Sequence, residues 1–233
     1  MNVHSGERVL DVAAGSGNAA ISAARRGARA TATDFVGSLL EIAQARAEIE
    51  GLALATAEAD AQDLPFEDAS FDVVLSTFGA MFAPDQQRAA DELVRVCRSG
   101  GRIGMANWAP GGLMCRNNVV LYKHVPPPPA AANLRRPIEW GNEERLRELF
   151  GDRVSELRTE RRSIDLCADS ADDLVEFNRT WFGPTRTAFA QLDEDGQARL
   201  AADLAAELER FNRATDGSLV AEAEYVEVVA VRK

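Results

Sequence analysis

The sequence contains few of the side chains that build metal centres, disulfide frameworks or histidine-based catalytic triads. Its three cysteines, Cys97, Cys115 and Cys167, are widely spaced and form no CxxC pair. We therefore expect neither a zinc site nor a disulfide framework, and reduced thiols are typical of a cytoplasmic protein. The two histidines, His4 and His124, leave few candidates for a histidine-based triad or a multi-histidine metal site.

Long apolar runs and an excess of positive charge are also missing. No run approaches the roughly 20 apolar residues that a membrane-spanning helix needs. The chain has 26 Lys and Arg against 37 Asp and Glu, a net charge of −11. This balance argues against electrostatic binding to nucleic acid or to an anionic membrane. The polar start MNVHSGE carries no signal peptide, so we expect an acidic cytoplasmic enzyme.

The first half of the chain alternates short strands and helices, which is the pattern that builds a parallel sheet. Strands are expected at Arg8–Val12, Ala30–Asp34, Leu54–Ala59, Phe71–Ser76 and Arg102–Trp108. Helices are expected at Asn18–Arg26, at Ser38–Glu50 behind a capping box of Ser38 and Glu41, and from an Asp85 cap through Cys97. A Ser99–Gly101 turn is expected before the fifth strand.

The alternation breaks over residues 109–142, which are rich in glycine and proline and predict an irregular insertion with a short helix near Asn117–Lys123. A sixth strand is expected within Val154–Leu166. A last strand at Tyr225–Arg232 could insert antiparallel into the sheet. Further helices are expected at Glu143–Phe150, Ser170–Phe182 and Gly196–Arg213.

The segment VLDVAAGSGNAA, residues 9–20, combines a buried strand, a glycine turn and the start of a helix. Glycines in such a turn let a ligand lie against bare backbone, and the helix start offers unpaired N–H groups to an anion. Asp11, Asp34 and Asp60 each lie near the end of one of three successive strands. Open α/β sheets bind ligands on that side.

The GSGNAA turn also fits the loose pattern of nicotinamide-dinucleotide domains, which is a weak signal. Asp11 argues against that ligand, because a carboxylate four residues before the first glycine would repel a pyrophosphate. It would suit a positively charged ligand group, such as an ammonium or a sulfonium.

Five blocks of sequence resemble the class I S-adenosylmethionine-dependent methyltransferases. They are most similar to the type 11 branch, which contains the ubiquinone and menaquinone C-methyltransferases. The resemblance spans residues 7–108 in order and spacing, and the rest matches only in general layout. The blocks are VLDVAAGSG, TATDF, ADAQDLPFEDASFDVV, STFGAM and RVCRSGGRIGMANW.

The resemblance implies an α/β fold, a Rossmann-like doubly wound sheet of seven strands, parallel except for an antiparallel C-terminal strand. Residues 1–233 would form a single methyltransferase domain. Residues 1–108 would be its cofactor-binding half. Residues 109–233 would be its substrate-side half, including the irregular insertion 109–142.

The implied cofactor is S-adenosyl-L-methionine, with S-adenosyl-L-homocysteine as the product. By the resemblance, its methionine part would be wrapped by the loop that contains Ala13, Gly15, Ser16 and Gly17. Asp11 would lie near the ammonium group, directly or through water.

The adenosine part of the cofactor would contact the ends of the next strands. Asp34 would bind the ribose hydroxyls, and Phe35 would lie along the adenine. Asp60 would accept from the adenine amino group, and the backbone N–H of Ala61 would reach a ring nitrogen. Thr77 would line the cofactor near the sulfonium.

Each polar residue also has a purely structural alternative. Asp11 could cap the following turn, and Asp34 could cap the helix entry near Ser38. Asp60 could form an Asx-turn, and Thr77 could satisfy only a backbone group.

Methyl transfer from a sulfonium is an in-line displacement, so the protein mainly supplies alignment and exclusion of water. A general base is needed only if the acceptor must lose a proton. His124 and Tyr122 are candidates for this base, and His4 and Glu176 are further possibilities. His124 could equally be a surface histidine beside Lys123.

The acceptor is expected to be a small organic molecule methylated on carbon, oxygen or nitrogen. The fourth strand is followed by STFG rather than the Asp/Asn-Pro-Pro-Tyr block of amino-methylating enzymes, and no basic stripe is present. Five aromatic residues could wall an apolar pocket as a group. They are Trp108, Trp140, Phe177, Trp181 and Phe182.

Two other functions compete with this prediction: a non-catalytic S-adenosylmethionine-binding protein that serves as a sensor or partner subunit, and, more remotely, an NAD-dependent oxidoreductase.

One departure from the family concerns the start of the chain. Relatives usually carry a few dozen residues before the first strand, whereas about seven precede it here. We therefore expect cofactor binding but poor turnover unless upstream residues are restored. The oligomeric state stays open.

Overall fold

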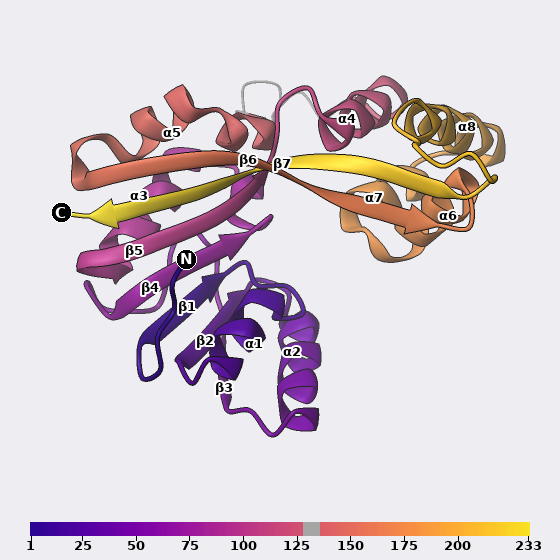
Figure 1. The fold of residues 1–233 in the computed structure, drawn as a ribbon. Helices are drawn as coiled ribbons and strands as arrows, with labels where there is room; N and C mark the ends of the chain where they lie inside the picture. Colours follow the sequence, from indigo (N-terminus) through magenta and orange to yellow (C-terminus); the bar gives the residue numbers. More distant parts are fainter. Residues whose placement is uncertain (128–135) are drawn as a thin grey trace. The chain divides into compact units, whose positions relative to one another are not determined.

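The computed structural model describes residues 1–127 and 136–233. Seven strands form one sheet in the order β3-β2-β1-β4-β5-β7-β6, and its first five members in that order run parallel. β7 runs antiparallel between β5 and β6 (Figure 1), which confirms the predicted fold class. The strands are β1 (Arg8–Val12), β2 (Arg29–Asp34), β3 (Leu54–Glu58), β4 (Phe71–Thr77), β5 (Cys97–Trp108), β6 (Val154–Ala168) and β7 (Leu219–Arg232).

The described chain divides into two compact units. The first contains residues 1–107, 136–160 and 226–233, and the second contains residues 108–127 and 161–225. Four helices belong to the first unit, together with three short 3-10 helices. They are α1 (Asn18–Arg25), α2 (Gly37–Ile49), α3 (Gln86–Val96), α5 (Glu143–Phe150), η1 (Ala80–Phe82), η3 (Pro137–Gly141) and η4 (Gly151–Arg153).

In the first unit the strand order reverses between β1 and β4, so the chain winds in opposite directions from the centre of the sheet. Right-handed crossovers then put α1 and α2 on one face and α3 and α5 on the other. The helices of each pair pack against each other. Small side chains let α1 lie close to the sheet: Ala20 and Ala23 pack with Val9 and Val73 in a buried cluster.

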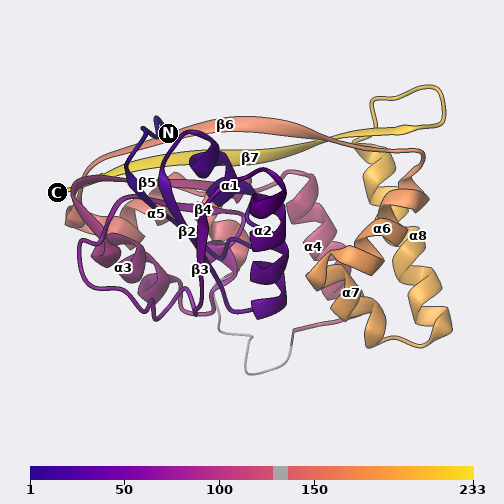
Figure 2. The same cartoon turned by 90° about the horizontal axis from the view of Figure 1, so that it is seen from below.

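The second unit is mainly helical, and Figure 2 shows its four helices gathered together. They are α4 (Leu113–His124), α6 (Ala171–Trp181), α7 (Gly183–Ala190) and α8 (Glu194–Arg210). α8 packs against both α4 and α6, and it buries Leu200, Leu204 and Leu208. The Nε–H of Arg116 in α4 donates to Oε1 of the buried Glu207 at 2.7 Å, which ties α4 to α8.

Several predicted boundaries were wrong for local reasons. The capping box of Ser38 and Glu41 does not form, because α2 begins at Gly37 with Val36 as its N-cap residue. The Ser99–Gly101 turn lies inside β5, where the pairing with β4 shifts register between Phe71 and Val73. α7 was not predicted from the sequence. β7 begins at Leu219 rather than at the predicted Tyr225.

The segment predicted as an irregular insertion contains α4, which is longer than the expected Asn117–Lys123 helix, and η3. Its residues 128–135 lie outside the described part of the chain. The division of the chain into a cofactor-binding and a substrate-side half stays a prediction.

Candidate functional site

The carboxyl ends of β1 and β4 lie side by side at the centre of the sheet, where the strand order reverses. Asp11 of β1 pairs in register with Leu75 of β4. The Ser76 hydroxyl donates to the Val12 carbonyl oxygen at 2.8 Å and accepts from the Ala80 N–H at 2.8 Å. Open α/β sheets bind ligands at such a reversal, outside the carboxyl ends of the strands.

The glycine loop, residues 13–17, connects β1 to α1 through three residues with positive φ. Ala13, Gly15 and Gly17 have φ angles of 53°, 55° and 82°. A Cβ added to Gly17 would lie 2.7 Å from the Cβ of Ala43 in α2. A Cβ added to Gly15 would meet no atom within 4 Å. The loop backbone is therefore packed tightly on its α2 side and open beside Gly15.

The loop after β4 approaches the glycine loop just as closely. A Cβ added to Gly79 would lie 2.4 Å from the Ala13 carbonyl oxygen, which real atoms do not tolerate. Phe78, the preceding residue, has a φ of 55°. Glycine at position 79 is therefore required for the two loops to meet. The block STFG contains this glycine, but nothing in the sequence shows which loop it contacts.

Asp11 is buried at the end of β1, with 1% of its surface exposed. Its Oδ2 accepts from the Ala20 N–H of α1 at 2.9 Å, whereas its buried Oδ1 has no hydrogen-bond partner among the described residues. Burial raises the pKa of this carboxyl to about 7; the Ala20 bond opposes that rise, and the negative charge of Asp34 adds to it. One oxygen thus caps α1, as the structural alternative proposed. The other lacks the partner that a buried carboxylate requires.

Asp34 ends β2 and connects the glycine loop to the start of α2. Its Oδ2 accepts from the Gly15 N–H at 2.8 Å, and its Oδ1 accepts from the Val36 N–H at 2.9 Å. The residue is 6% exposed. Each carboxylate oxygen has two lone pairs, so both oxygens retain one acceptor position. The bond to Val36 lies at the entry to α2, where the structural alternative expected Asp34 to act as a cap.

The other residues predicted to bind the adenosine part lie at the surface. Phe35 follows Asp34 and is 73% exposed. Asp60 is exposed, and its Oδ1 accepts from the Gln62 N–H at 2.9 Å, which is the Asx-turn alternative. Ala61 is half-buried, and Thr77 is exposed at the end of β4. The ring of Phe35 and the carboxylate of Asp60 are therefore accessible to a ligand, whereas Asp34 is buried.

Arg46 of α2 was missed by the sequence analysis. Its Nη1 donates to the Ser16 carbonyl oxygen at 2.6 Å, to the Ser16 hydroxyl oxygen at 3.1 Å and to Oδ1 of Asn18 at 2.8 Å. These contacts connect α2 to the glycine loop. No spacing rule predicts them, because Arg46 follows Ser16 by thirty positions.

The candidate bases His124 and Tyr122 lie on α4 in the second unit. Nε2 of His124 lies 2.8 Å from Oδ2 of Asp203 in α8, and Nζ of Lys123 donates to the same oxygen at 2.7 Å. Both contacts hold the pKa of Asp203 below its usual range. Tyr122 is 39% exposed. This cluster links α4 to α8, and a role in proton transfer stays a prediction.

The five aromatic residues predicted to wall a pocket differ in burial. Trp140 is buried in the first unit. In the second unit Trp108 is buried and Phe182 half-buried, whereas Phe177 and Trp181 on α6 are exposed. Phe177 and Trp181 therefore do not pack into the core of that unit.

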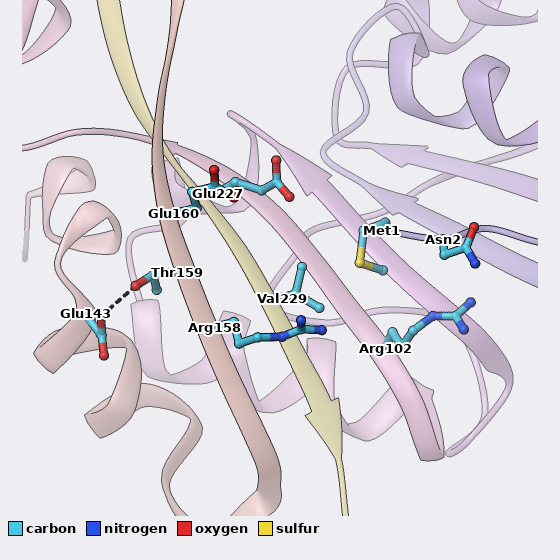
Figure 3. A pocket seen from close by; sticks show the side chains of 9 residues that line it. All are labelled: Met1, Asn2, Arg102, Glu143, Arg158, Thr159, Glu160, Glu227 and Val229. Atoms are coloured by element: carbon cyan, nitrogen blue, oxygen red, sulfur yellow. Dashed lines mark hydrogen bonds between the residues drawn. The ribbon is translucent and has the colours of Figure 1, made fainter.

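The first unit also contains a cavity of about 730 Å³, and Figure 3 draws the side chains that line it. It lies over β5, β6 and β7 beside the start of the chain. Arg102, one of its charged residues, pairs in register with Val73 near the amino end of β4 and binds Glu7 at 2.7 Å. None of the predicted cofactor residues lines it. Its lining residues are Met1, Asn2, Arg102, Glu143, Arg158, Thr159, Glu160, Glu227 and Val229.

Among residues 1–127 and 136–233, no group of three or more His, Cys, Asp or Glu side chains is arranged to hold a metal ion. In the same part of the chain, no helix has both the length and the apolar character needed to cross a membrane.

Comparison with known proteins identifies relatives of the sequence. The profile of a methyltransferase-domain family matches residues 10–105. An uncharacterised protein of Mycobacterium tuberculosis is 44% identical over 206 residues, which cover 88% of this chain and 72% of that protein. The demethylmenaquinone methyltransferase of Thermobifida fusca is 36% identical over 142 residues, which cover 60% of this chain and 52% of that enzyme.

A solved structure is also similar. It is phosphoethanolamine N-methyltransferase 2 of Haemonchus contortus in complex with phosphomonomethylethanolamine and S-adenosylhomocysteine. It matches with a TM-score of 0.62 and 18% identity over 99% of this chain and 50% of that chain, which shows a shared fold. Sheet order, glycine loop and sequence matches together define a class I S-adenosylmethionine-dependent methyltransferase. Within that class, the chain belongs to the type 11 branch.

Proposed function

We propose that this protein transfers the methyl group of S-adenosylmethionine to a small organic acceptor. The observation that carries the proposal is Asp11, a carboxyl buried at the strand reversal, one oxygen of which has no partner in the described part of the chain. A cationic group of a ligand would supply the missing interaction. A buried carboxylate costs free energy until it is paired, so the site favours a cationic ligand over a pyrophosphate.

The methionine part of the cofactor would lie along the glycine loop. Ala13, Gly15, Ser16 and Gly17 would offer backbone beside the open space at Gly15. Asp11 would lie near the ammonium group, directly or through water, with its buried Oδ1 as the acceptor. Because a nearby cation favours the ionised carboxyl, binding would lower the pKa of Asp11 and release a proton near neutral pH.

The adenosine part would lie across the ends of β2 and β3. Asp34 would accept from the ribose hydroxyls through its remaining lone pairs, while its existing bonds hold the carboxylate in place. The exposed ring of Phe35 would lie along the adenine. Asp60 and the backbone N–H of Ala61 would read the adenine edge, which requires Gln62 to release or share Asp60.

The cofactor supplies an electrophilic methyl group, so the chain's own residues need only hold the two reactants in line and exclude water. Thr77, exposed at the end of β4, would line the reacting end of the cofactor. His124 and Tyr122 would matter only for an acceptor that must lose a proton.

The acceptor is proposed as a small molecule methylated on carbon, oxygen or nitrogen. The match to the demethylmenaquinone methyltransferase of Thermobifida fusca supports a hydroxylated ring as the first class to test. The similar nematode structure carries a phosphorylated amine, which is the second class.

The test is release of S-adenosylhomocysteine from S-adenosylmethionine in the presence of 1,4-dihydroxynaphthalene or phosphoethanolamine, with methylated products identified by mass spectrometry. We expect product with at least one acceptor and none in a matched Asp34→Ala variant. Cofactor binding without turnover on any acceptor would instead support the non-catalytic binding protein.

A further inference from the structure

Arg46 is the α2 residue that holds the glycine loop. All three of its contacts with the loop and the start of α1 come from one nitrogen, Nη1, at 2.6, 3.1 and 2.8 Å. Two of them reach the carbonyl and hydroxyl oxygens of Ser16, at the apex of the loop, and the third reaches Asn18, the first residue of α1. The side chain is only half-buried, so the guanidinium retains contact with water.

The glycine loop needs such an anchor because its backbone is unusual. Three of its five residues, Ala13, Gly15 and Gly17, have positive φ. Glycine residues also lose more conformational freedom on ordering than any other residue. A loop that is ordered before the ligand arrives binds more tightly, because the ordering cost is met during folding.

The three contacts of Arg46 all reach Ser16 and Asn18, at the end of the glycine loop and the start of α1. They hold Ser16 and Asn18 from the α2 side of the glycine loop, and the methionine part of the cofactor is proposed to lie along the open side of the same loop. Of the residues proposed for the adenosine part, Asp34 accepts hydrogen bonds from Gly15 and Val36, and Asp60 accepts from Gln62, rather than from Arg46. Loss of the Arg46 contacts should therefore weaken binding of the methionine part of the cofactor more than binding of the adenosine part.

We propose that Arg46 is a positioning residue that shapes the glycine loop for the amino-acid part of the cofactor. This inference rests on the proposed function. It predicts that Arg46 governs affinity for ligands that carry the homocysteine or methionine group. It also predicts little influence on ligands that carry only the adenosine part.

Two probes separate these parts: S-adenosylhomocysteine, which has the amino-acid group, and 5′-methylthioadenosine, which lacks it. We expect Arg46→Met to weaken binding of S-adenosylhomocysteine about tenfold, the loss of roughly one to two hydrogen bonds. Binding of 5′-methylthioadenosine should change less than about twofold, and the thermal midpoint should fall by no more than about 4 °C. Calorimetric titration and thermal unfolding of the full chain give these values.

Two further variants sharpen the test. Arg46→Lys should recover much of the lost affinity, because all three contacts use a single nitrogen rather than the planar fork of the guanidinium. Arg25→Met is the matched control. It removes the same charge from an exposed ion pair with Glu50 at the far end of α1, and it should leave both affinities unchanged.

The outcomes are separable. If the wild-type chain does not bind S-adenosylhomocysteine, the proposed function fails, and the inference that rests on it is overturned with it. If the wild type binds and Arg46→Met weakens both probes equally, or unfolds the chain, Arg46 is a general structural residue and the inference is overturned. An unchanged affinity for both probes overturns it as well.

Discussion

The backbone N–H of Gly15 donates a 2.8 Å hydrogen bond to the carboxylate of Asp34. This bond connects the glycine loop after β1 to the end of β2, so the two halves of the candidate site are one hydrogen-bonded unit. The other Asp34 oxygen holds the Val36 N–H at the entry to α2. A change at Asp34 should therefore reach both the loop and the helix.

The first prediction concerns the pH dependence of stability at Asp11. Burial raises the pKa of this carboxyl to about 7, so the folded chain retains a proton that the unfolded chain has already lost. The contribution of Asp11 to the free energy of unfolding should decrease between about pH 4 and pH 7, by roughly 1 kcal/mol per pH unit, and then stay constant.

Asp11→Asn should therefore be more stable than the wild type at about pH 8, and the difference should nearly vanish at about pH 4. The asparagine can still accept from the Ala20 N–H, which keeps the cap of α1. Chemical denaturation across this range measures the difference. A difference in stability that does not change with pH, or a variant less stable than the wild type at the higher pH, contradicts a raised pKa of Asp11.

A second prediction concerns the contact between the two loops. Gly79→Ala places a Cβ 2.4 Å from the Ala13 carbonyl oxygen, so the loop after β4 must move away from the glycine loop. We expect a loss of about 1–3 kcal/mol in stability and weaker binding of S-adenosylhomocysteine. Gly183→Ala, at an open position in α7, is the control and should be neutral or slightly stabilising. Equal stability of the two variants would show that the loops are not in contact.

A third prediction concerns Asn107 at the end of β5. The residue is 1% exposed, and neither its Oδ1 nor its Nδ2 has a hydrogen-bond partner within residues 1–127 and 136–233. Removing a buried polar group that has no partner costs little, so Asn107→Leu should change stability by less than about 1 kcal/mol, or raise it. Ser76→Ala, which removes two buried hydrogen bonds, should cost about 1–3 kcal/mol.

Denaturant titration of both variants checks this contrast. A large loss in Asn107→Leu would mean that the amide is satisfied in solution by an ordered water.

The fold was largely predictable from the sequence because its periodicity is local. The alternation of apolar strands with glycine turns predicts the ends of β1 and β2, near Asp11 and at Asp34. It also predicts the start of α1 at Asn18. The N-cap role of Asp85 also follows from residue type and spacing, and the structure confirms it. β7 could be expected antiparallel because it directly follows a long helix at the end of the chain.

The tertiary contacts of the site were not predictable. The hydrogen bonds of Arg46 to Ser16 and the approach of Gly79 to Ala13 join residues far apart in the chain, and no local pattern encodes them. The Asx-turn of Asp60 and the helix-entry bond of Asp34 were foreseen only as alternatives. A side chain can serve both a turn and a ligand, so residue type alone does not separate the two roles.

The most direct test of the central claim is calorimetric titration of the purified chain with S-adenosylmethionine, S-adenosylhomocysteine and NAD. It is repeated for Asp34→Ala and Asp34→Asn, with Asp63→Ala as a control that removes an exposed acid of the same charge. We expect both sulfur nucleotides to bind the wild type and the control, to bind the Asp34 variants far more weakly, and NAD not to bind. Binding of NAD without binding of the sulfur nucleotides would contradict the proposed site.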